Sequence, residues 1–428
     1  MRTKSRLGAT LLATGMIIAL AACGRGDEDG GAGGSDGADV SVAPQASEVD
    51  TSAASGDIDV WAMGAEGEAL GAFAESFMEE FPDVTVNVTP VPWDAAHDRI
   101  VSAIAGGEVP DVTMVGTTWM GEFASLGGLD PTPANIDGSQ FFEGAWNTTV
   151  VDGTSYAVPW YVETRLFYYR TDLAGDAEAP ATWDDLKAMA AAMQEAGAEY
   201  GISLQPGGTG SWQTWMPFFW QAGGEIMGED GTFTLDGEPC VEAMTFYDAF
   251  FEEGLTPPAA EDVPVEGRFA NGEIASFISG PWMMSIVEDA GTDPATYAVA
   301  HQPTEAAGTS FVGGSNMAVL ADADNKQAGW AFLEYLSRPD VQAAWYEEVS
   351  ALPAVQAAWD EEALSGDEKL AAFGDQLSDA KAPPAIATWE QIAAEIDGII
   401  EQVTVGDMTP EEGCPAMQDA ASSIGTGQ

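Results

Sequence analysis

Between residues 57 and 82 the apolar positions follow first the spacing of a strand and then that of a helix. Residues 57–61 (DIDVW) alternate between polar and apolar side chains, which predicts a strand with one buried face. From 70 to 81 the apolar residues recur every three or four positions, which predicts a helix. Because proline cannot continue a helix, we expect this one to end at Pro82.

The same two patterns follow once more up to residue 115. The valines within 84–88 alternate with polar residues and predict a second strand. We expect Asp94 to cap a helix that ends at Gly106-Gly107, and the apolar residues 112–115 to form a buried strand. The order strand, helix, strand, helix, strand is typical of an open parallel sheet covered by helices. The sequence therefore predicts an α/β fold.

Segments of the same two kinds occur through the rest of the chain. Strands are predicted at 274–278 and 311–320, and helices at 183–196, 241–253, 327–336 and 392–403. In open α/β sheets, ligands bind beyond the carboxyl ends of the strands. Glu66 comes just after the first strand, and Thr118 and Trp119 come just after the third. We therefore expect these three residues on one ligand-binding rim.

The charge of the chain restricts what it can bind. Thirteen Lys and Arg against 70 Asp and Glu give a formal net charge of −57. A field this negative repels phosphate backbones, so we expect no nucleic-acid partner. With two histidines in 428 residues, we expect no metal site and no cofactor. Because unbalanced carboxylates repel one another in dilute salt, we also expect stability to increase with salt concentration.

The N-terminus has the pattern of an export signal. Residues 1–22 begin with a basic stretch, contain no acidic residue and continue as a short apolar run, which predicts a signal peptide. A short membrane anchor that stays attached is the alternative. The run ends Leu-Ala-Ala before Cys23, which resembles the lipidation box of bacterial lipoproteins. We expect residues 23–56 to be a lipidated Cys23 followed by a flexible linker rich in Gly, Ala, Ser and Asp.

Two cysteines remain if Cys23 is lipidated. Cys240 and Cys414 are an even pair in an exported chain, and this permits a disulfide across 174 residues (414 − 240). Two free buried thiols are the alternative. A thiol assay on the denatured, unreduced protein distinguishes them.

Six short motifs along the chain together resemble those of a known protein family. The chain is similar to the family-1 extracellular solute-binding proteins of carbohydrate ABC importers, which include maltodextrin- and trehalose-binding proteins. The resemblance covers residues 58–420, and its motifs are VWAMG (60–64), PDVTMV (110–115), YAVPWYVETRLFYYR (156–170), TWDDL (182–186), ISGPW (278–282) and FVGGSN (311–316).

The resemblance implies a two-lobed, periplasmic-binding-protein-like fold of type II, with a ligand cleft between lobes joined by crossing segments. Residues 158–169 would form the first crossing, and the second would follow at about Tyr346. The lobes would then comprise residues 57–163 plus 311–346, and 164–310 plus 347–428.

The resemblance also implies which side chains bind a sugar. Flat rings cover the apolar faces of a pyranose, and carboxylates and amides bind its hydroxyls. Glu163 matches an acidic sugar contact, Trp282 a stacking residue and Trp389 a C-terminal aromatic that closes over the ligand. The remaining candidates are Glu66, Thr118, Trp119, Trp212, Ser315 and Asn316. For each, packing or solvent contact is the alternative role. One of Arg165 and Arg268 would orient Glu163 or bind a sugar hydroxyl; an ion pair between the lobes is the alternative.

The implied function is capture rather than chemistry. The protein would be a monomer that binds a neutral sugar by lobe closure and delivers it to an ABC permease, lipid-anchored on the outer face of the cytoplasmic membrane. Several candidate tryptophans favour a di- or oligosaccharide over a single ring. A secreted glycoside hydrolase that uses paired carboxylates is the alternative, and turnover of neutral oligosaccharides would distinguish it.

Overall fold

The computed structural model describes residues 46–228, 230–258 and 264–427. The predicted signal peptide and Cys23 lie outside these residues. Within them, no helix combines the length and apolar character needed to cross a membrane. The end of the predicted linker is structured: Ala46 donates its N–H to Thr132, and Asp50 caps a 3-10 helix, η1 (Thr51–Ala53). These are contacts of the backbone and a cap, which require no apolar side chain.

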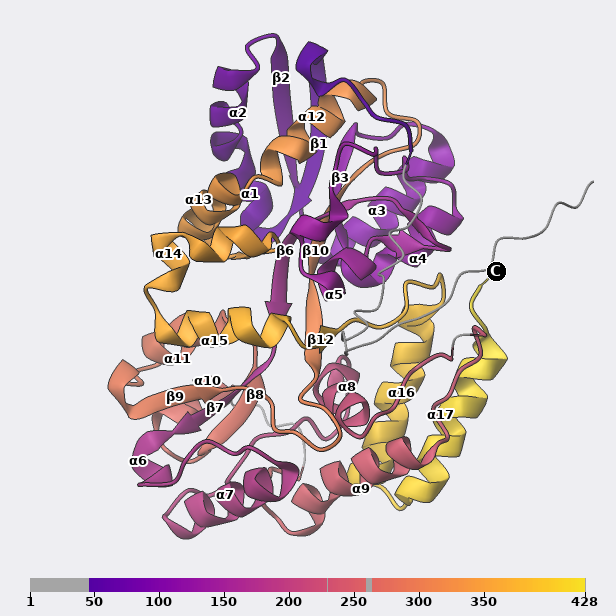
Figure 1. Ribbon diagram of the computed structural model, residues 1–428. Coiled ribbons are helices and arrows are strands. Elements are labelled where there is room, and N and C mark those ends of the chain that lie inside the picture. Colours follow the sequence, from indigo (N-terminus) through magenta and orange to yellow (C-terminus); the bar gives the residue numbers. More distant parts are fainter. Residues whose placement is uncertain (1–45, 229, 259–263, 428) are drawn as a thin grey trace, which may run out of the picture. The chain divides into compact units, whose positions relative to one another are not determined.

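The described residues form a seven-stranded sheet of mixed direction (Figure 1). The strand order is β11-β6-β10-β3-β1-β2, and β12 pairs with β10. Its strands are β1 (Gly56–Met63), β2 (Val84–Val91), β3 (Val112–Gly116), β6 (Val158–Thr164), β10 (Ser310–Val319), β11 (Leu352–Pro353) and β12 (Ala380–Lys381). The pairs of β1 with β2 and with β3 are parallel, as predicted, but β10 runs antiparallel to β3 and β6. The predicted parallel pairing of the first three strands is therefore confirmed, and β10 adds antiparallel pairs to the same sheet.

Helices and a small hairpin pack around this sheet. They are α1 (Gly64–Phe73), α2 (Glu75–Glu80), α3 (Trp93–Gly106), η2 (Thr117–Trp119), α4 (Met120–Ser125), η3 (Gly138–Gln140), α5 (Glu143–Asn147), β4 (Val150–Val151), β5 (Thr154–Ser155), α12 (Lys326–Leu336) and α13 (Pro339–Val349). The helix predicted at 70–81 is two helices separated at Ala74. Asp94 lies in the first turn of α3, and Pro92 is the N-cap, so the predicted cap is also wrong.

A second, smaller sheet has the order β8-β7-β9, and both of its pairs are antiparallel. Its strands are β7 (Leu166–Arg170), β8 (Ser276–Ser279) and β9 (Tyr297–Ala300). Its helices are α6 (Thr171–Ala174), α7 (Trp183–Glu195), α8 (Ser211–Gln221), α9 (Glu238–Glu252), α10 (Val265–Ala270), α11 (Met283–Asp289), η4 (Pro294–Thr296), α16 (Trp389–Thr404) and α17 (Pro410–Ile424). A disulfide between Cys240 and Cys414 (S–S 2.07 Å) links α9 to α17.

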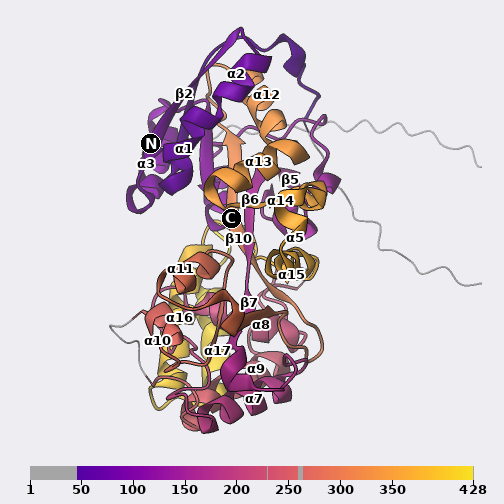
Figure 2. The ribbon, with the colours of Figure 1, turned by 90° about the vertical axis from the view of Figure 1, so that its left-hand side faces the viewer.

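The chain first passes from the large sheet to the small one through a single residue, and it returns to the large sheet between β9 and β10. β6 ends at Thr164 and β7 begins at Leu166, so Arg165 alone separates them (Figures 1 and 2). After α13 the chain pairs with β6 through β11, later than the boundary expected at residue 346. It then forms η5 (Gln356–Asp360), α14 (Glu362–Ser365) and α15 (Glu368–Leu377) before it reaches β12 and α16. The fold is thus the predicted two-lobed α/β arrangement.

Candidate functional site

Three neighbouring parallel strands of the large sheet each lead into a polar or aromatic side chain. Glu66 lies in the first turn of α1 after β1, Trp93 begins α3 after β2, and Trp119 ends η2 after β3. Since the carboxyl ends of parallel strands meet at one edge of a sheet, these residues share that edge. We call Glu66, Trp93 and Trp119 the upper wall of the site. Trp93 was not predicted, although it satisfies the same rule.

The two tryptophans of the upper wall contact each other and approach the backbone closely. Their ring centres are 5.8 Å apart with planes at 66°, and Trp93 is 40% exposed. A Cβ on Gly64, whose φ is +61°, would lie 2.7 Å from Nε1 of Trp93 and 3.0 Å from Oε2 of Glu66. The indole N–H and the carboxylate therefore converge above Gly64, where only a glycine leaves room. Thr118 is half-buried in the same turn as Trp119.

The crossing segment contributes a carboxylate held by a guanidinium. Nη2 of Arg165 donates to Oε1 of Glu163 at 3.2 Å and to Oε1 of Gln213 at 3.0 Å. The guanidinium carbon lies 4.7 Å from the ring centre of Trp282. Arg165 thus orients Glu163 and supports Trp282, as one of its two predicted roles required. Arg268 donates instead to Glu199 and Glu273, and neither glutamate lines this site.

The charges of the two carboxylates, Glu66 and Glu163, act on each other. Burial raises the pKa of Glu66, a bond to its own backbone N–H opposes this, and the charge of Glu163 raises it further. Burial raises the pKa of the Tyr161 hydroxyl well above its usual value, and the charges of Glu66 and Glu163 add to the effect. Two close carboxylates are strong acceptors for hydroxyl donors. The arrangement suits a ligand that presents several hydroxyl groups.

Trp282 and a polar cavity beside the small sheet form a second part of the site. Trp282 is 38% exposed and lies between β8 and α11. It borders a cavity of about 430 Å³. Hydrogen-bonding side chains on its lining are Arg165, Ser203, Gln205, Thr209, Gln213, Thr214 and Ser279. Amide and hydroxyl groups of this kind can both donate to and accept from a sugar. Apart from Arg165, none of these polar residues was predicted.

Four predicted ligand residues are buried elsewhere. Trp212 and Trp389 are 4% and 0% exposed, and their rings pack edge to face with centres 5.2 Å apart. Ser315 donates its hydroxyl to the Val115 carbonyl, and Asn316 donates to the Thr148 hydroxyl. In this conformation a ligand reaches none of the four, so we reassign them to packing. On α8 the neighbour of Trp212, Gln213, faces the cavity, because adjacent helix residues point about 100° apart.

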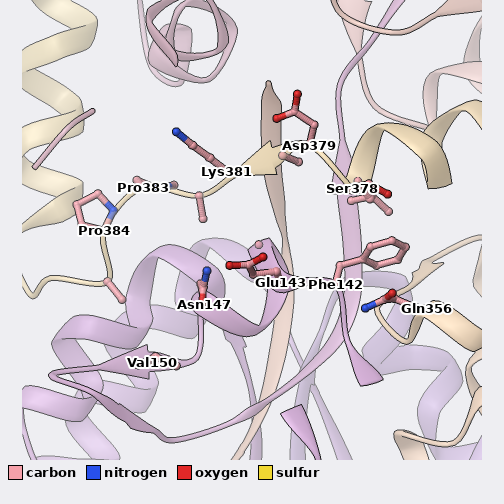
Figure 3. Close-up of a pocket in the computed structure, with 15 residues that line it drawn as sticks. Phe142, Glu143, Asn147, Val150, Gln356, Ser378, Asp379, Lys381, Pro383 and Pro384 are labelled. Carbon is pink, nitrogen blue, oxygen red and sulfur yellow. The ribbon is translucent and has the colours of Figure 1, made fainter. Parts of the chain in front are cut away.

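A larger cavity of about 780 Å³ contains none of the predicted site residues. Glu143 and Asn147 of α5 line it beneath the segment 378–385 (Figure 3). The one aromatic ring on its lining, Phe142, is 8% exposed. Because it offers no open ring to a sugar face, we place the ligand site at Trp282. In the described ranges no group of three or more His, Cys, Asp or Glu side chains is arranged to hold a metal ion.

The chain is similar to several known proteins. The solved structure of the sugar-binding protein MalE of Xanthomonas citri has a TM-score of 0.81 and 31% identity, and covers 86% of this chain and 97% of its own. The solved structure of the GacH receptor of Streptomyces glaucescens has a TM-score of 0.74 and 28% identity, and the match covers 86% of this chain and 98% of the GacH chain. The diacetylchitobiose-binding protein DasA of Streptomyces coelicolor is 27% identical over 353 residues, 77% of each chain.

A family model described as bacterial extracellular solute-binding protein matches residues 61–343, which is more than half of the chain. The match includes all three residues of the upper wall, the crossing at Arg165 and Trp282. The chain belongs to the bacterial extracellular solute-binding protein family.

Proposed function

We propose that this protein is the sugar-binding component of an ABC importer and that it binds an uncharged di- or oligosaccharide at the site described above. The observation that supports this most is the presence of two exposed indoles, Trp93 and Trp282, together with two carboxylates, Glu66 and Glu163, whose charges act on each other. The relatives support the ligand class: GacH was solved with acarbose, and DasA is named for diacetylchitobiose.

The charges of the site favour a neutral ligand. Glu163 already engages the charge of Arg165, whose guanidinium lies against Trp282, and no cation is shown to contact Glu66 among the described residues. An anionic sugar would meet an uncompensated carboxylate at Glu66, which costs binding energy. Uncharged hydroxyls can instead donate to both carboxylates, while the ring faces pack on the indoles.

Capture then follows from the construction of the two walls. The upper wall belongs to helices and turns after the large sheet, whereas Trp282 and the polar cavity belong to the small sheet. A sugar that contacts both walls stabilises the arrangement in which they are closest, and so drives closure. The closed form would then be the one that an ABC permease recognises.

Anchoring is a separate part of the proposal. We expect Cys23 to be lipidated, which would keep a monomeric receptor on the outer face of the cytoplasmic membrane and raise its effective concentration near the permease. The family description, extracellular, supports a location outside the cytoplasm. Metabolic labelling with a radioactive fatty acid, compared with a Cys23→Ser variant, tests the anchor.

A sugar screen tests the function. Melting temperatures measured with a panel of neutral mono-, di- and oligosaccharides should rise for the preferred ligand, because a ligand that binds only the native state stabilises it. Calorimetry should then give one site per chain, with a higher Kd in Glu163→Gln and Trp282→Ala. Chromatography of the sugar after long incubation should recover it intact. Turnover would instead support the glycosidase alternative.

A further inference from the structure

We propose that His97 positions Trp119 in the upper wall, and that protonation of His97 tightens sugar binding. The clause about binding rests on the proposed function, whereas the clause about Trp119 does not. His97 is one of two histidines in the chain, and it is not among the proposed sugar contacts.

His97 connects two elements beside the site. It lies on α3, and its Nε2 is 2.8 Å from Oε2 of Glu122 on α4. Both side chains are about one-third exposed, 32% and 35%. The pair therefore joins the helix that begins with Trp93 to the helix that follows Trp119.

The imidazole ring also contacts Trp119 directly. The two ring centres are 5.4 Å apart with planes at 77°, and the His97 ring lies 5.5 Å from that of Phe123. The indole of Trp119 also contacts the backbone at Gly116, where a Cβ would lie 3.2 Å from its ring atoms. Trp119 thus rests against Gly116, His97, Trp93 and Phe123. A displacement of His97 removes one of these supports.

Protonation changes the bonds that His97 can make. A neutral imidazole has one N–H, so if Nε2 donates to Glu122, Nδ1 faces Oδ1 of Asp98, 3.4 Å away, with a lone pair. An imidazolium donates from both nitrogens. The charged groups around it are Glu122 on α4 and Asp98 and Asp94 on α3, while η2 contributes Trp119 and no charge. Arg99 is engaged with Trp61, 3.9 Å from its ring centre.

The first measurement uses no sugar. The full chain is labelled with 5-fluorotryptophan, and the ¹⁹F resonance of Trp119 is assigned by its absence in Trp119→Phe. Between pH 8 and pH 5 this resonance should shift in a single titration in the wild type. The shift should be lost in His97→Gln, which retains a donor near Glu122 but does not titrate. His301→Gln makes the same change at the other, exposed histidine and should leave the titration intact.

The second measurement uses the sugar found in the screen. The Kd of the wild type and of His301→Gln should be about two- to tenfold lower at pH 6 than that of His97→Gln, the range expected for one hydrogen bond. At pH 8 the difference should shrink. All variants retain Glu66, so its titration cancels in the comparison.

The outcomes are separable. A Trp119 resonance that does not respond to pH, or that titrates equally in His97→Gln, overturns the positioning role whether or not any sugar binds. A titration without a difference in Kd overturns the effect on binding. If no sugar binds, the proposed function fails and the resonance still tests the contact. Should His97→Gln not fold, His97→Phe, which retains a ring without a titrating nitrogen, replaces it in both measurements.

Discussion

Alanine at Gly280 should displace Trp282 without touching the ligand. A Cβ on Gly280 would lie 2.0 Å from Cζ3 and 2.2 Å from Cη2 of Trp282. Carbon atoms in contact stay about 3.5 Å apart, so the ring must move by about 1.5 Å. The backbone accepts the change, because Gly280 is not among the glycines with positive φ. The substitution therefore tests the position of the ring and leaves its identity unchanged.

The expected loss falls on binding rather than on folding. Trp282 is 38% exposed, so its ring has room to move into solvent. Displacement weakens its contact with Arg165, which costs about 0.5–1 kcal/mol of stability. Loss of a well-placed aromatic face costs about 0.5–1.5 kcal/mol of binding, which corresponds to a Kd about two- to tenfold higher. The contacts of Glu163 with hydroxyls should remain.

Calorimetry of the preferred sugar with wild type, Gly280→Ala and Trp282→Ala measures this effect. Gly267→Ala is the matched control, because nothing lies within 4 Å of a Cβ at that position. Its Kd should equal that of the wild type. Binding by Gly280→Ala as tight as that of the wild type, with Trp282→Ala impaired, would refute the reasoning about the ring position. So would a loss of several kcal/mol in urea unfolding.

Three further changes should alter stability. Because burial raises the pKa of Glu66, the native state keeps the proton of this carboxyl to higher pH than the unfolded chain does. The stability that goes with the protonated carboxyl is present below pH 4.5 and is lost as the pH rises from 4.5 through the raised pKa. Glu66→Gln should therefore raise the Tm near neutrality and have less effect near pH 4; an equal effect at both pH values contradicts this. Replacing Cys240 and Cys414 with alanine should lower the free energy of unfolding in urea by about 4–5 kcal/mol on the chain-entropy model, since the bond spans 174 residues; unchanged stability would show that the loop is already restricted when unfolded. The net charge of −57 predicts a Tm that rises from low to molar salt, and a flat Tm would refute the repulsion argument.

The parts of the fold that follow a local pattern could be predicted. Apolar spacing located the first three strands, and the rule about strand ends brought Glu66 and Trp119 to one edge. The same rule applies to Trp93, which directly follows β2. It was missed because Asp94, as the predicted cap, put the helix start two residues too late: the N-cap is Pro92. The rule that ligand residues follow the carboxyl ends of parallel strands therefore holds for Trp93, although the sequence prediction did not apply it there.

The direction of individual side chains required the tertiary structure. Trp212 and Gln213 are adjacent, yet the indole is buried against Trp389 and the amide lines the cavity. Asn316 lies in β10, between β6 and β3, where both faces are buried and its amide bonds within the protein. Composition gives the right residue types for a sugar site. Only the packing of helices and strands decides which of them face the ligand.

A crystal structure of the protein with its preferred sugar tests the central claim most directly. We predict a sugar ring packed on the exposed indole of Trp282, with hydroxyls within hydrogen-bond distance of Glu66 and Glu163 and an unbroken glycosidic bond. A sugar bound instead in the 780 Å³ cavity beside α5, or a cleaved sugar at Trp282, would contradict the account.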